Sequence, residues 1–388
     1  MSTTTFDVAA ARERFSSLRS GFAFLDAPGG TQVPDEVGEA IARALRDASG
    51  NLGAPYATGR AVEEILAGAK ADAGRFLGCV ADDVAFGMNM TSLNFAVSRA
   101  AGRDFAAGGE ILTTQLDHDG GVAPWVELAA DRGMEVVVAN ATDGLTVDYD
   151  DLERKLSDRT RVVAFALASN ATGSVADAQR ICRLAREAGA LSWIDAVHYA
   201  AHEPIDVNEI GCDVLLCSPY KFCGPHLGMA YLRPEAAESW RPYKARPSSS
   251  SPLGRRFETG TLPYELLAGF QATIAYLDSL GGMAVLRDYE RGLGERFLAE
   301  LPDGVTLYGP PTMAERVPTF LLNVDGVEAE TVARTLAGRG LGVWYADYWY
   351  CVALEDRLPS SSVRVGFIHY NTEDEVDRLV DELAALAG

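Results

Sequence analysis

Residues 191–232 read LSWIDAVHYAAHEPIDVNEIGCDVLLCSPYKFCGPHLGMAYL, and this stretch decides the fold that we expect. Two short apolar runs, LSWIDA and DVLLCS, are rich in β-forming residues and bounded by turn residues, which predicts two buried strands. Ligands of open α/β sheets bind just beyond the carboxyl ends of the strands. The first run delivers Asp195 to this edge, and the second delivers Ser218, Tyr220 and Lys221. An acid and a lysine are therefore expected at neighbouring strand ends.

A lysine and a carboxylate at one sheet edge match the needs of pyridoxal phosphate (PLP). The lysine amine condenses with the cofactor aldehyde, and a carboxylate pairs with the protonated pyridine nitrogen so that the ring accepts electrons. Hydroxyl groups and a helix N-terminus hold the phosphate. Lys221 alone could be a solvated loop residue and Asp195 alone a turn residue. Together, on consecutive predicted strands, they favour PLP as the cofactor.

The composition is that of a large soluble protein. The chain has 388 residues, 48% of them hydrophobic, and a formal net charge of −21. This length suffices for one large and one smaller domain. The negative charge is spread along the chain, which disfavours nucleic acid or an anionic membrane as a partner. The N-terminus lacks the apolar core of a signal peptide, and the longest apolar run, VVAFALA, is too short to span a bilayer. We therefore expect a cytoplasmic protein.

The six cysteines occur without a CxxC pair or a repeated spacing. This usage disfavours a disulfide framework and a metal site, and it predicts reduced thiols. Most of these cysteines are expected to be small core residues.

Predicted strands and helices alternate through the first two thirds of the chain. The strand candidates are VAFGMN, EILTTQ, MEVVVAN, RVVAFALAS, LSWIDA, DVLLCS and MAYL. This alternation predicts a doubly wound α/β fold, in which a seven-stranded, mostly parallel sheet carries helices on both faces. MAYL follows DVLLCS too closely for a helical crossover, so we expect it to be antiparallel to its neighbour.

We expect three parts along the chain: an N-terminal arm (1–20), a large cofactor-binding domain (21–258) and a smaller α+β domain (259–388). A loop at 241–258 is rich in Pro, Ser and basic residues. It indicates a solvated linker, a lid or a segment contributed across a dimer interface. In the smaller domain we expect strands at 305–309, 317–324, 341–346 and 363–370, and helices at 328–340 and 374–386. Earlier helices are expected at 34–48 and 60–77.

Further polar residues follow the predicted strands. Thr91 and Ser92 begin an apolar helix, where they act as an N-cap and also offer an anion site. His118 follows EILTTQ and is able to stack on a pyridine ring, although a lone histidine is more often structural. Asn170 follows RVVAFALAS, and His198 lies just beyond Asp195. Both are expected near the hydroxyl of that ring.

Other candidates lie outside this sheet. Gly29 and Gly30 form a turn or let the backbone approach a substrate; their own segment favours a turn. Arg364 is expected in a strand among valines, where it needs an anionic partner, either a substrate carboxylate or a structural salt bridge. Cys351 lies in an aromatic loop, WYADYWYCVALEDRLPSSS, that predicts a pocket wall or an interface patch.

Four segments of the chain resemble motifs of one known family. They are LDAPGGTQVP, SPYKFCGP, RFETGT and VRVGFIHYNTEDEVDRL. The second resembles the Ser-x-His-Lys-x-x-Gly-Pro motif around the PLP lysine of the class V aminotransferase group of fold-type I enzymes. All four are similar to segments of its cysteine desulfurase-like branch. The resemblance covers nearly the whole chain and implies a fold-type I PLP-dependent transferase.

The resemblance also implies roles for individual residues. Lys221 would bind PLP covalently and act as catalytic base, Asp195 would pair with the pyridine nitrogen, and Arg364 would bind the substrate carboxylate. The family forms homodimers with shared active sites. The remaining implied positions are His118 on the ring, Asn170 and His198 near its hydroxyl, Thr91, Ser92, Ser218 and Tyr220 at the phosphate, and Gly260-Thr261 from a second subunit.

Four departures from the family pattern leave the reaction open. Tyr220 stands where desulfurases have histidine, and His198 where they commonly have glutamine. His118 is followed by Asp119-Gly120-Gly121 rather than the usual sequence, and the motif around Cys351 differs from that of the persulfide cysteine. The leading hypothesis is that Cys351 takes sulfur from cysteine, leaving alanine, and passes it to a sulfur-acceptor protein. The alternatives are a C–S lyase, an amino-acid epimerase and a non-catalytic scaffold or regulator.

Overall fold

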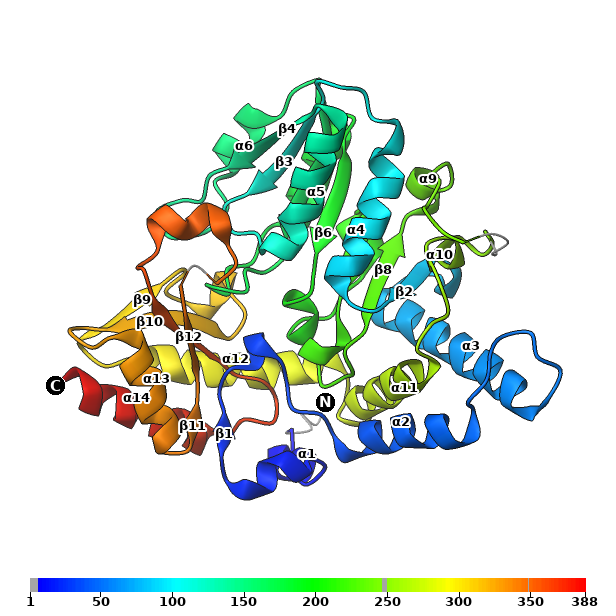
Figure 1. The fold of residues 1–388 in the computed structure, drawn as a ribbon. Helices are drawn as coiled ribbons and strands as arrows, with labels where there is room; N and C mark the ends of the chain where they lie inside the picture. Colours follow the sequence, from blue (N-terminus) through cyan, green and yellow to red (C-terminus); the bar gives the residue numbers. More distant parts are fainter. Residues whose placement is uncertain (1–5, 246–249, 348) are drawn as a thin grey trace, which may run out of the picture.

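Seven strands form one sheet in the computed structural model, which describes residues 6–245, 250–347 and 349–388 (Figure 1). All seven expected strands are present. β8 is antiparallel to both of its neighbours and the other pairs are parallel, so the expected mostly parallel sheet and its antiparallel member are confirmed. The spatial order is β2 (Val84–Gly87), β8 (Gly228–Leu232), β7 (Val214–Cys217), β6 (Leu191–Asp195), β5 (Thr160–Ala166), β3 (Glu110–Thr114) and β4 (Glu135–Ala139).

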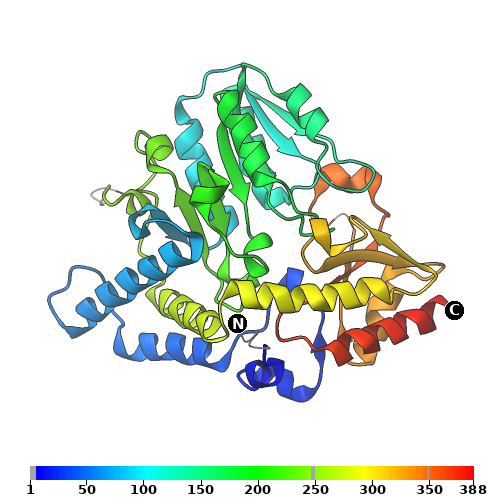
Figure 2. The same cartoon turned by 180° about the vertical axis from the view of Figure 1, so that it is seen from behind.

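Helices cover both faces of this sheet (Figures 1 and 2). α4 (Met90–Ala101) and α5 (Asp119–Arg132) lie on one face, and α7 (Ala178–Glu187) lies on the other. Successive strand residues point to opposite faces. Trp193 of β6 therefore packs in the cluster with α4 and α5, whereas Ile194 packs in the cluster with α7. Because both faces are covered, the strands read as continuous apolar runs.

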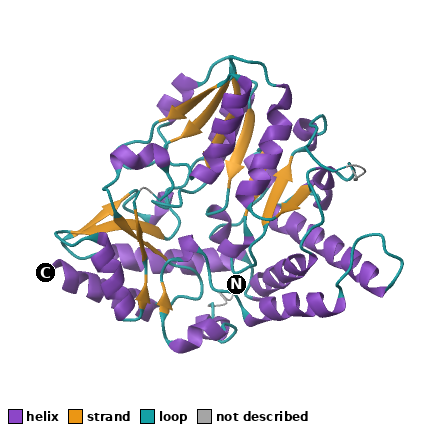
Figure 3. Cartoon of the chain, in the orientation of Figure 1, coloured by secondary structure: helices purple, strands orange, loops and turns teal. Residues whose placement is uncertain are grey.

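A second, four-stranded antiparallel sheet lies beside the first (Figure 3). Its order is β12 (Trp344–Ala346), β13 (Ser362–Gly366), β10 (Thr319–Val324) and β9 (Val305–Tyr308). It shares an apolar core with α12 (Met283–Ala299), α13 (Ala329–Gly338) and α14 (Glu373–Ala387).

The prediction of one strand at 341–346 was wrong in one respect, because this segment forms two strands that belong to different sheets. β12 pairs with β13, whereas β11 (Leu341–Gly342) pairs in parallel with β1 (Ala23–Phe24). β1 was not expected from the sequence. It brings the N-terminal segment against the C-terminal part of the chain.

The division into domains stays a prediction. Two sets of contacts join the expected large domain (21–258) to the expected smaller domain (259–388). β1 pairs with β11, and α11 packs against α2 and α3. The remaining α-helices are α1 (Val8–Arg12), α2 (Asp35–Asp47), α3 (Ala57–Leu77), α6 (Tyr149–Lys155), α8 (Val207–Ile210), α9 (Pro234–Ala237), α10 (Leu253–Arg256) and α11 (Tyr264–Ser279). Short 3-10 helices occur at Ser16–Ser20, Ala27–Gly29, Ala81–Asp83, Gly102–Asp104, Tyr199–Ala201, Pro219–Lys221, Met313–Glu315 and Val352–Arg357.

Among the described residues, no helix combines the length and the apolar character needed to cross a membrane.

Candidate active site

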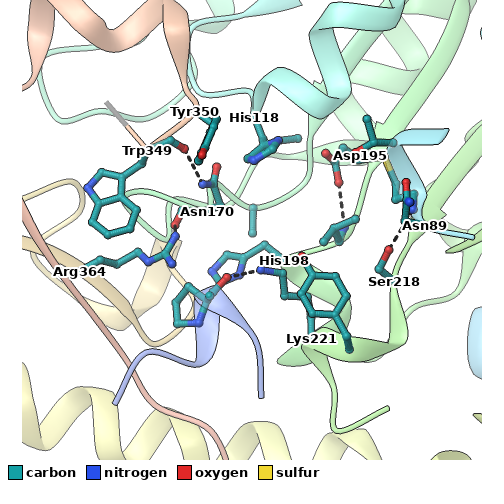
Figure 4. A pocket seen from close by; sticks show the side chains of 18 of the residues that line it. Asn89, His118, Asn170, Asp195, His198, Ser218, Lys221, Trp349, Tyr350 and Arg364 are labelled. Carbon is teal, nitrogen blue, oxygen red and sulfur yellow. Dashed lines mark hydrogen bonds between the residues drawn. The ribbon is translucent and has the colours of Figure 1, made fainter. Parts of the chain in front are cut away.

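A cavity of about 310 Å³ lies beyond the carboxyl ends of β5, β6 and β7 (Figure 4). Ligand pockets in proteins commonly measure roughly 300–1,000 Å³. Side chains from both sheets line it, so most of the expected site residues meet in one place. These are Gly29, Thr91, His118, Asn170, Asp195, His198, Ser218, Tyr220, Lys221 and Arg364.

Lys221 reaches the cavity from the turn that follows β7. Its amine donates a hydrogen bond to the Pro28 carbonyl and lies 4.7 Å from the centre of the Tyr220 ring. Burial and the nearby Arg364 guanidinium lower the pKa of Lys221 to about 7. A substantial fraction of this amine is therefore neutral at physiological pH, and a neutral amine is the nucleophilic form.

Asp195 ends β6 and lines the same cavity. Its Oδ1 accepts a hydrogen bond from the Val197 backbone N–H at 2.9 Å. Burial raises the pKa of Asp195 to about 7, and the negative charge of Asp117 adds to this effect. A cationic ring nitrogen beside the carboxylate would oppose both causes and keep Asp195 ionised.

His118 caps the N-terminus of α5 through its own ring. Nδ1 accepts a hydrogen bond from the Gly120 backbone N–H at 2.9 Å, which leaves Nε2 to carry the hydrogen. Burial, Lys221 and Arg364 lower the pKa of His118 to about 4. The imidazole is therefore neutral at physiological pH.

The N-terminus of α4 forms the opposite end of the cavity. Asn89 caps this helix by accepting from the Ser92 backbone N–H at 2.8 Å, and the Met90 backbone N–H donates to Ser218 Oγ at 3.2 Å. Asn89, Met90 and Thr91 line the cavity, whereas Ser92 does not. Unpaired helix N–H groups and the helix dipole favour an anion here. Sequence reasoning missed Asn89, although its N-cap position was readable.

Arg364 in β13 has an internal anionic partner. Its Nε donates to Asp26 Oδ1 at 3.0 Å, and Nη1 donates to the Asn170 carbonyl at 3.0 Å. The Trp349 ring centre lies 4.1 Å from the guanidinium carbon and that of Trp344 lies 5.8 Å away. The structural salt bridge is therefore present, and the guanidinium also faces the cavity (Figure 4).

The aromatic loop forms one wall of this cavity. Trp349 and Tyr350 adopt left-handed backbone angles, with φ of 58° and 60°, which bulky residues rarely adopt. Their carbonyls accept hydrogen bonds from Asn170 Nδ2 at 2.9 Å and the Asp119 backbone N–H at 2.7 Å. Strain of this kind persists where the surroundings hold it and clusters at functional sites. Tyr348, another expected member of the wall, lies outside the described residues.

Cys351 lies behind this wall and does not line the cavity. Its thiol is buried, donates to Asn170 Oδ1 at 3.3 Å and lies 3.8 Å from the Leu116 carbonyl. Burial raises the pKa of Cys351 to about 12. In this position the thiol is neither ionised nor exposed, and both are needed for nucleophilic attack. None of the other five cysteines lines the cavity either.

Three of the expected glycine and threonine positions lie elsewhere. Gly260 and Thr261 are exposed and line a separate hollow beside Lys244. Gly30 borders the far side of Tyr220. Gly29 lines the cavity, and a Cβ there would lie 2.1 Å from Asp26 Oδ2, so only glycine fits beside the carboxylate that holds Arg364.

Comparison with known proteins shows the family of this chain. Residues 23–379 match the family model described as aminotransferase class-V. The chain belongs to that family. One member, the probable cysteine desulfurase 2 of Mycobacterium leprae, is 32% identical to this class-V chain over 98% of its length and 96% of the relative.

Solved structures share the fold of this class-V family chain. The apo structure of a cysteine desulfurase from Thermococcus onnurineus matches with a TM-score of 0.92 and 23% identity, covering 100% of this chain and 99% of that one. A C-DES mutant with glycine covalently linked to its PLP cofactor matches with a TM-score of 0.84 and 18% identity, covering 97% and 99%. These neighbours confirm the expected fold-type I architecture.

Proposed function

We propose that this class-V family protein is a PLP-dependent enzyme that acts on an amino acid by cysteine desulfurase-like chemistry. The observation that carries the proposal is that Lys221 and Asp195 face one cavity, with Arg364 at its end (Figure 4). The cavity offers an amine of lowered pKa, a half-buried carboxylate and a helix N-terminus. Among the described residues, no cationic group lies within hydrogen-bonding distance of that carboxylate. These groups fit the aldehyde, the pyridine nitrogen and the phosphate of PLP.

Each residue then has a task. When bound, PLP supplies an electron-accepting ring that stabilises negative charge on the substrate α-carbon. Asp195 would keep the ring nitrogen protonated, and His118 would supply a neutral ring to cover the cofactor. The Lys221 amine would take the α-proton of the substrate, and its pKa near 7 suits that transfer. Arg364 orients the substrate carboxylate.

A C–S lyase is the second candidate, and the burial of Cys351 favours it. A desulfurase of the leading hypothesis needs an enzyme thiol that attacks the substrate sulfur and holds it for an acceptor protein. In this structure the Cys351 thiol hydrogen-bonds Asn170 behind Trp349 and Tyr350. In β-elimination the sulfur leaves as sulfide, and cysteine plus water gives pyruvate, ammonia and hydrogen sulfide. That route requires no enzyme thiol.

Replacing Cys351 by serine separates the two candidates. If Cys351 carries sulfur, C351S loses alanine formation from cysteine and loses the persulfide, while PLP stays bound. If the enzyme is a lyase, C351S keeps forming pyruvate and sulfide at a rate close to that of the wild type. Mass spectrometry of the products and of the protein reads both outcomes. Cys182→Ser is the matched control, because that thiol is also buried but belongs to α7, which contributes no residue to the cavity lining.

The same product analysis tests the two remaining alternatives. Exchange of the α-hydrogen with deuterium from solvent, with loss of optical purity and no release of sulfur, would indicate an epimerase. A purified protein that is colourless with added PLP and does not react with borohydride would indicate a non-catalytic scaffold.

The lowered pKa of Lys221 predicts how cofactor uptake depends on pH. The neutral amine attacks the aldehyde, so uptake rises as pH increases through the pKa and levels off above it. For Lys221 the midpoint is expected near pH 7, whereas an unperturbed lysine keeps rising towards about 10.4. Stopped-flow absorbance of apo-protein mixed with PLP at a series of pH values measures this midpoint. A rate that still climbs above pH 9 would contradict the expected lysine environment.

Replacing Arg364 by methionine is expected to weaken substrate binding and also to lower stability, because Asp26 loses its salt-bridge partner. The variant loses the guanidinium that faces the cavity, and with it one charged hydrogen bond to the substrate, worth about 1.5–3 kcal/mol. We therefore expect KM for an amino acid to rise about 10- to 100-fold. Steady-state kinetics give KM and kcat separately. Arg316→Met is the matched control, since Arg316 is also buried but donates only to backbone carbonyls away from the cavity. An unchanged KM in Arg364→Met would remove Arg364 from the substrate site.

A homodimer is part of the same proposal. Gly260 and Thr261 are exposed and far from their own cavity, which suits contribution to the cavity of a second subunit. Light scattering reads the oligomeric state. A cytoplasmic location and a sulfur-acceptor protein also stay proposals, and the second depends on an enzyme thiol that carries sulfur.

A further inference from the structure

Three buried residues, His202, Glu290 and His369, continue inward from His198 at the cavity wall and have no task in the proposed chemistry. The path begins at His198, which lines the cavity, and runs through His202 and Glu290 to His369. None of these residues is more than 4% exposed. The first two follow β6, Glu290 belongs to α12, and His369 follows β13. Buried ionisable side chains are costly unless each is paired, so the path is expected to have a purpose.

Glu290 anchors the inner end of the path. Its Oε2 lies 2.7 Å from His202 Nδ1, and its Oε1 lies 3.3 Å from His369 Nδ1. Burial alone would raise the pKa of Glu290, but the two histidines lower it below its ordinary value. An ionised carboxylate only accepts hydrogen bonds, so both Nδ1 atoms carry hydrogen. His369 Nε2 then accepts from the Tyr276 hydroxyl at 2.9 Å.

The path has one gap, between His198 and His202. The two rings meet edge to face with centroids 5.3 Å apart. His198 Nε2 pairs with Thr319 Oγ1 at 2.9 Å. His198 Nδ1 and His202 Nε2 are both buried and have no hydrogen-bond partner in the part of the chain that the structure describes. One internal water between the adjacent rings would satisfy both nitrogens, as buried polar groups in proteins almost always are.

We propose that His202, held by Glu290 and joined to His198 by one internal water, is a positioning residue that fixes the orientation and proton arrangement of His198 at the cavity wall. The proposal rests on the proposed function, because His198 is expected beside the ring hydroxyl of PLP. The positioning role of His202 gives a reason for His198, which stands where desulfurases commonly have glutamine. The other titratable or charged groups near the path are Lys221 and Arg364 on the cavity side, and Glu203, Cys223 and Tyr276 further in.

The first test uses protein without cofactor, so its result does not depend on the proposed function. Imidazole ¹⁵N shifts of the five histidines are measured and assigned by single replacements. Glu290→Gln is expected to shift the signals of His198 as well as those of His202, although Glu290 does not touch His198. Tyr276→Phe is the matched control at the other end of the path and is expected to shift His369 alone. Unchanged His198 signals in Glu290→Gln would overturn the proposal.

The second test uses the PLP-loaded protein and reads the pH dependence of its visible absorbance. Glu290→Gln and His202→Asn are expected to shift the midpoint of this titration in the same direction, and Tyr276→Phe to leave it unchanged. If Glu290→Gln does not fold, His202→Asn carries both tests. A wild-type midpoint in His202→Asn would overturn the positioning role, whereas failure of the wild type to bind PLP would count only against the proposed function. A crystal structure without a water between the two rings would also overturn the proposal.

Discussion

Lys221→Ala will abolish the covalent attachment of PLP and will lower turnover by about 10²- to 10⁴-fold or more, the range for losing a positioned proton-transfer group. The reason is that the variant loses both the amine that holds the aldehyde and the base that takes the α-proton. Absorbance spectra and turnover with cysteine measure the two losses. The cavity itself should persist, because Lys221 contributes one hydrogen bond, to the Pro28 carbonyl.

Borohydride reduction of the wild-type protein provides an internal control for this result. Reduction fixes the cofactor to its lysine, and peptide mapping then identifies the site. Lys221 is expected to carry the label. Lys70 is also buried but is paired with Glu258 and should stay unlabelled. A label on Lys70, or a yellow and active Lys221→Ala variant, would contradict the proposed cofactor site.

Asp195→Asn is expected to lower turnover by about 10²- to 10³-fold, as seen when one preorganised electrostatic partner is removed. Asparagine keeps an oxygen for the Val197 backbone N–H, so folding should be little affected. It cannot keep the ring nitrogen protonated, because it carries no charge. The measurements are kcat and the melting temperature. An Asp195→Asn variant with wild-type turnover would exclude Asp195 as the partner of the ring nitrogen.

Asp117 provides the matched control for Asp195. It is buried nearby, but its oxygens accept from the Thr114 backbone N–H, the Thr114 hydroxyl and the Ala166 backbone N–H, each at 2.7 Å. Asp117→Asn replaces one accepting oxygen by a donor, so it is expected to cost about 1–3 kcal/mol of stability. The two variants should therefore differ in the quantity that changes. Asp195→Asn mainly lowers kcat, whereas Asp117→Asn mainly lowers the melting temperature.

Much of the cavity could be predicted because it depends on local patterns. Lys221, Asp195, His118 and Asn170 each follow an apolar run, and the carboxyl ends of parallel strands meet at one edge of the sheet. Every one of these four residues lines the cavity. The antiparallel β8 could be predicted for a similar reason, because a short connection excludes a crossover.

The remaining features depend on contacts between residues that are distant in sequence. Nothing near Arg364 indicates that its partner is Asp26, and nothing near Leu341 indicates that the strand breaks so that β11 can pair with β1. The burial of Cys351 depends on contacts with Leu116 and Asn170, and loop composition alone does not indicate such docking. Whether Gly260 and Thr261 serve a second subunit depends on a partner chain, which lies beyond what one sequence specifies.

The pairing of Asp26 with Arg364 has a consequence for the order in which the protein is made. During synthesis, Asp195 and Lys221 leave the ribosome before Arg364 does. The end of the cavity that would receive the substrate carboxylate then still lacks its guanidinium, because Arg364 lies 338 positions after its partner Asp26. The nascent protein would thus gain the means to hold its cofactor before the means to select a substrate.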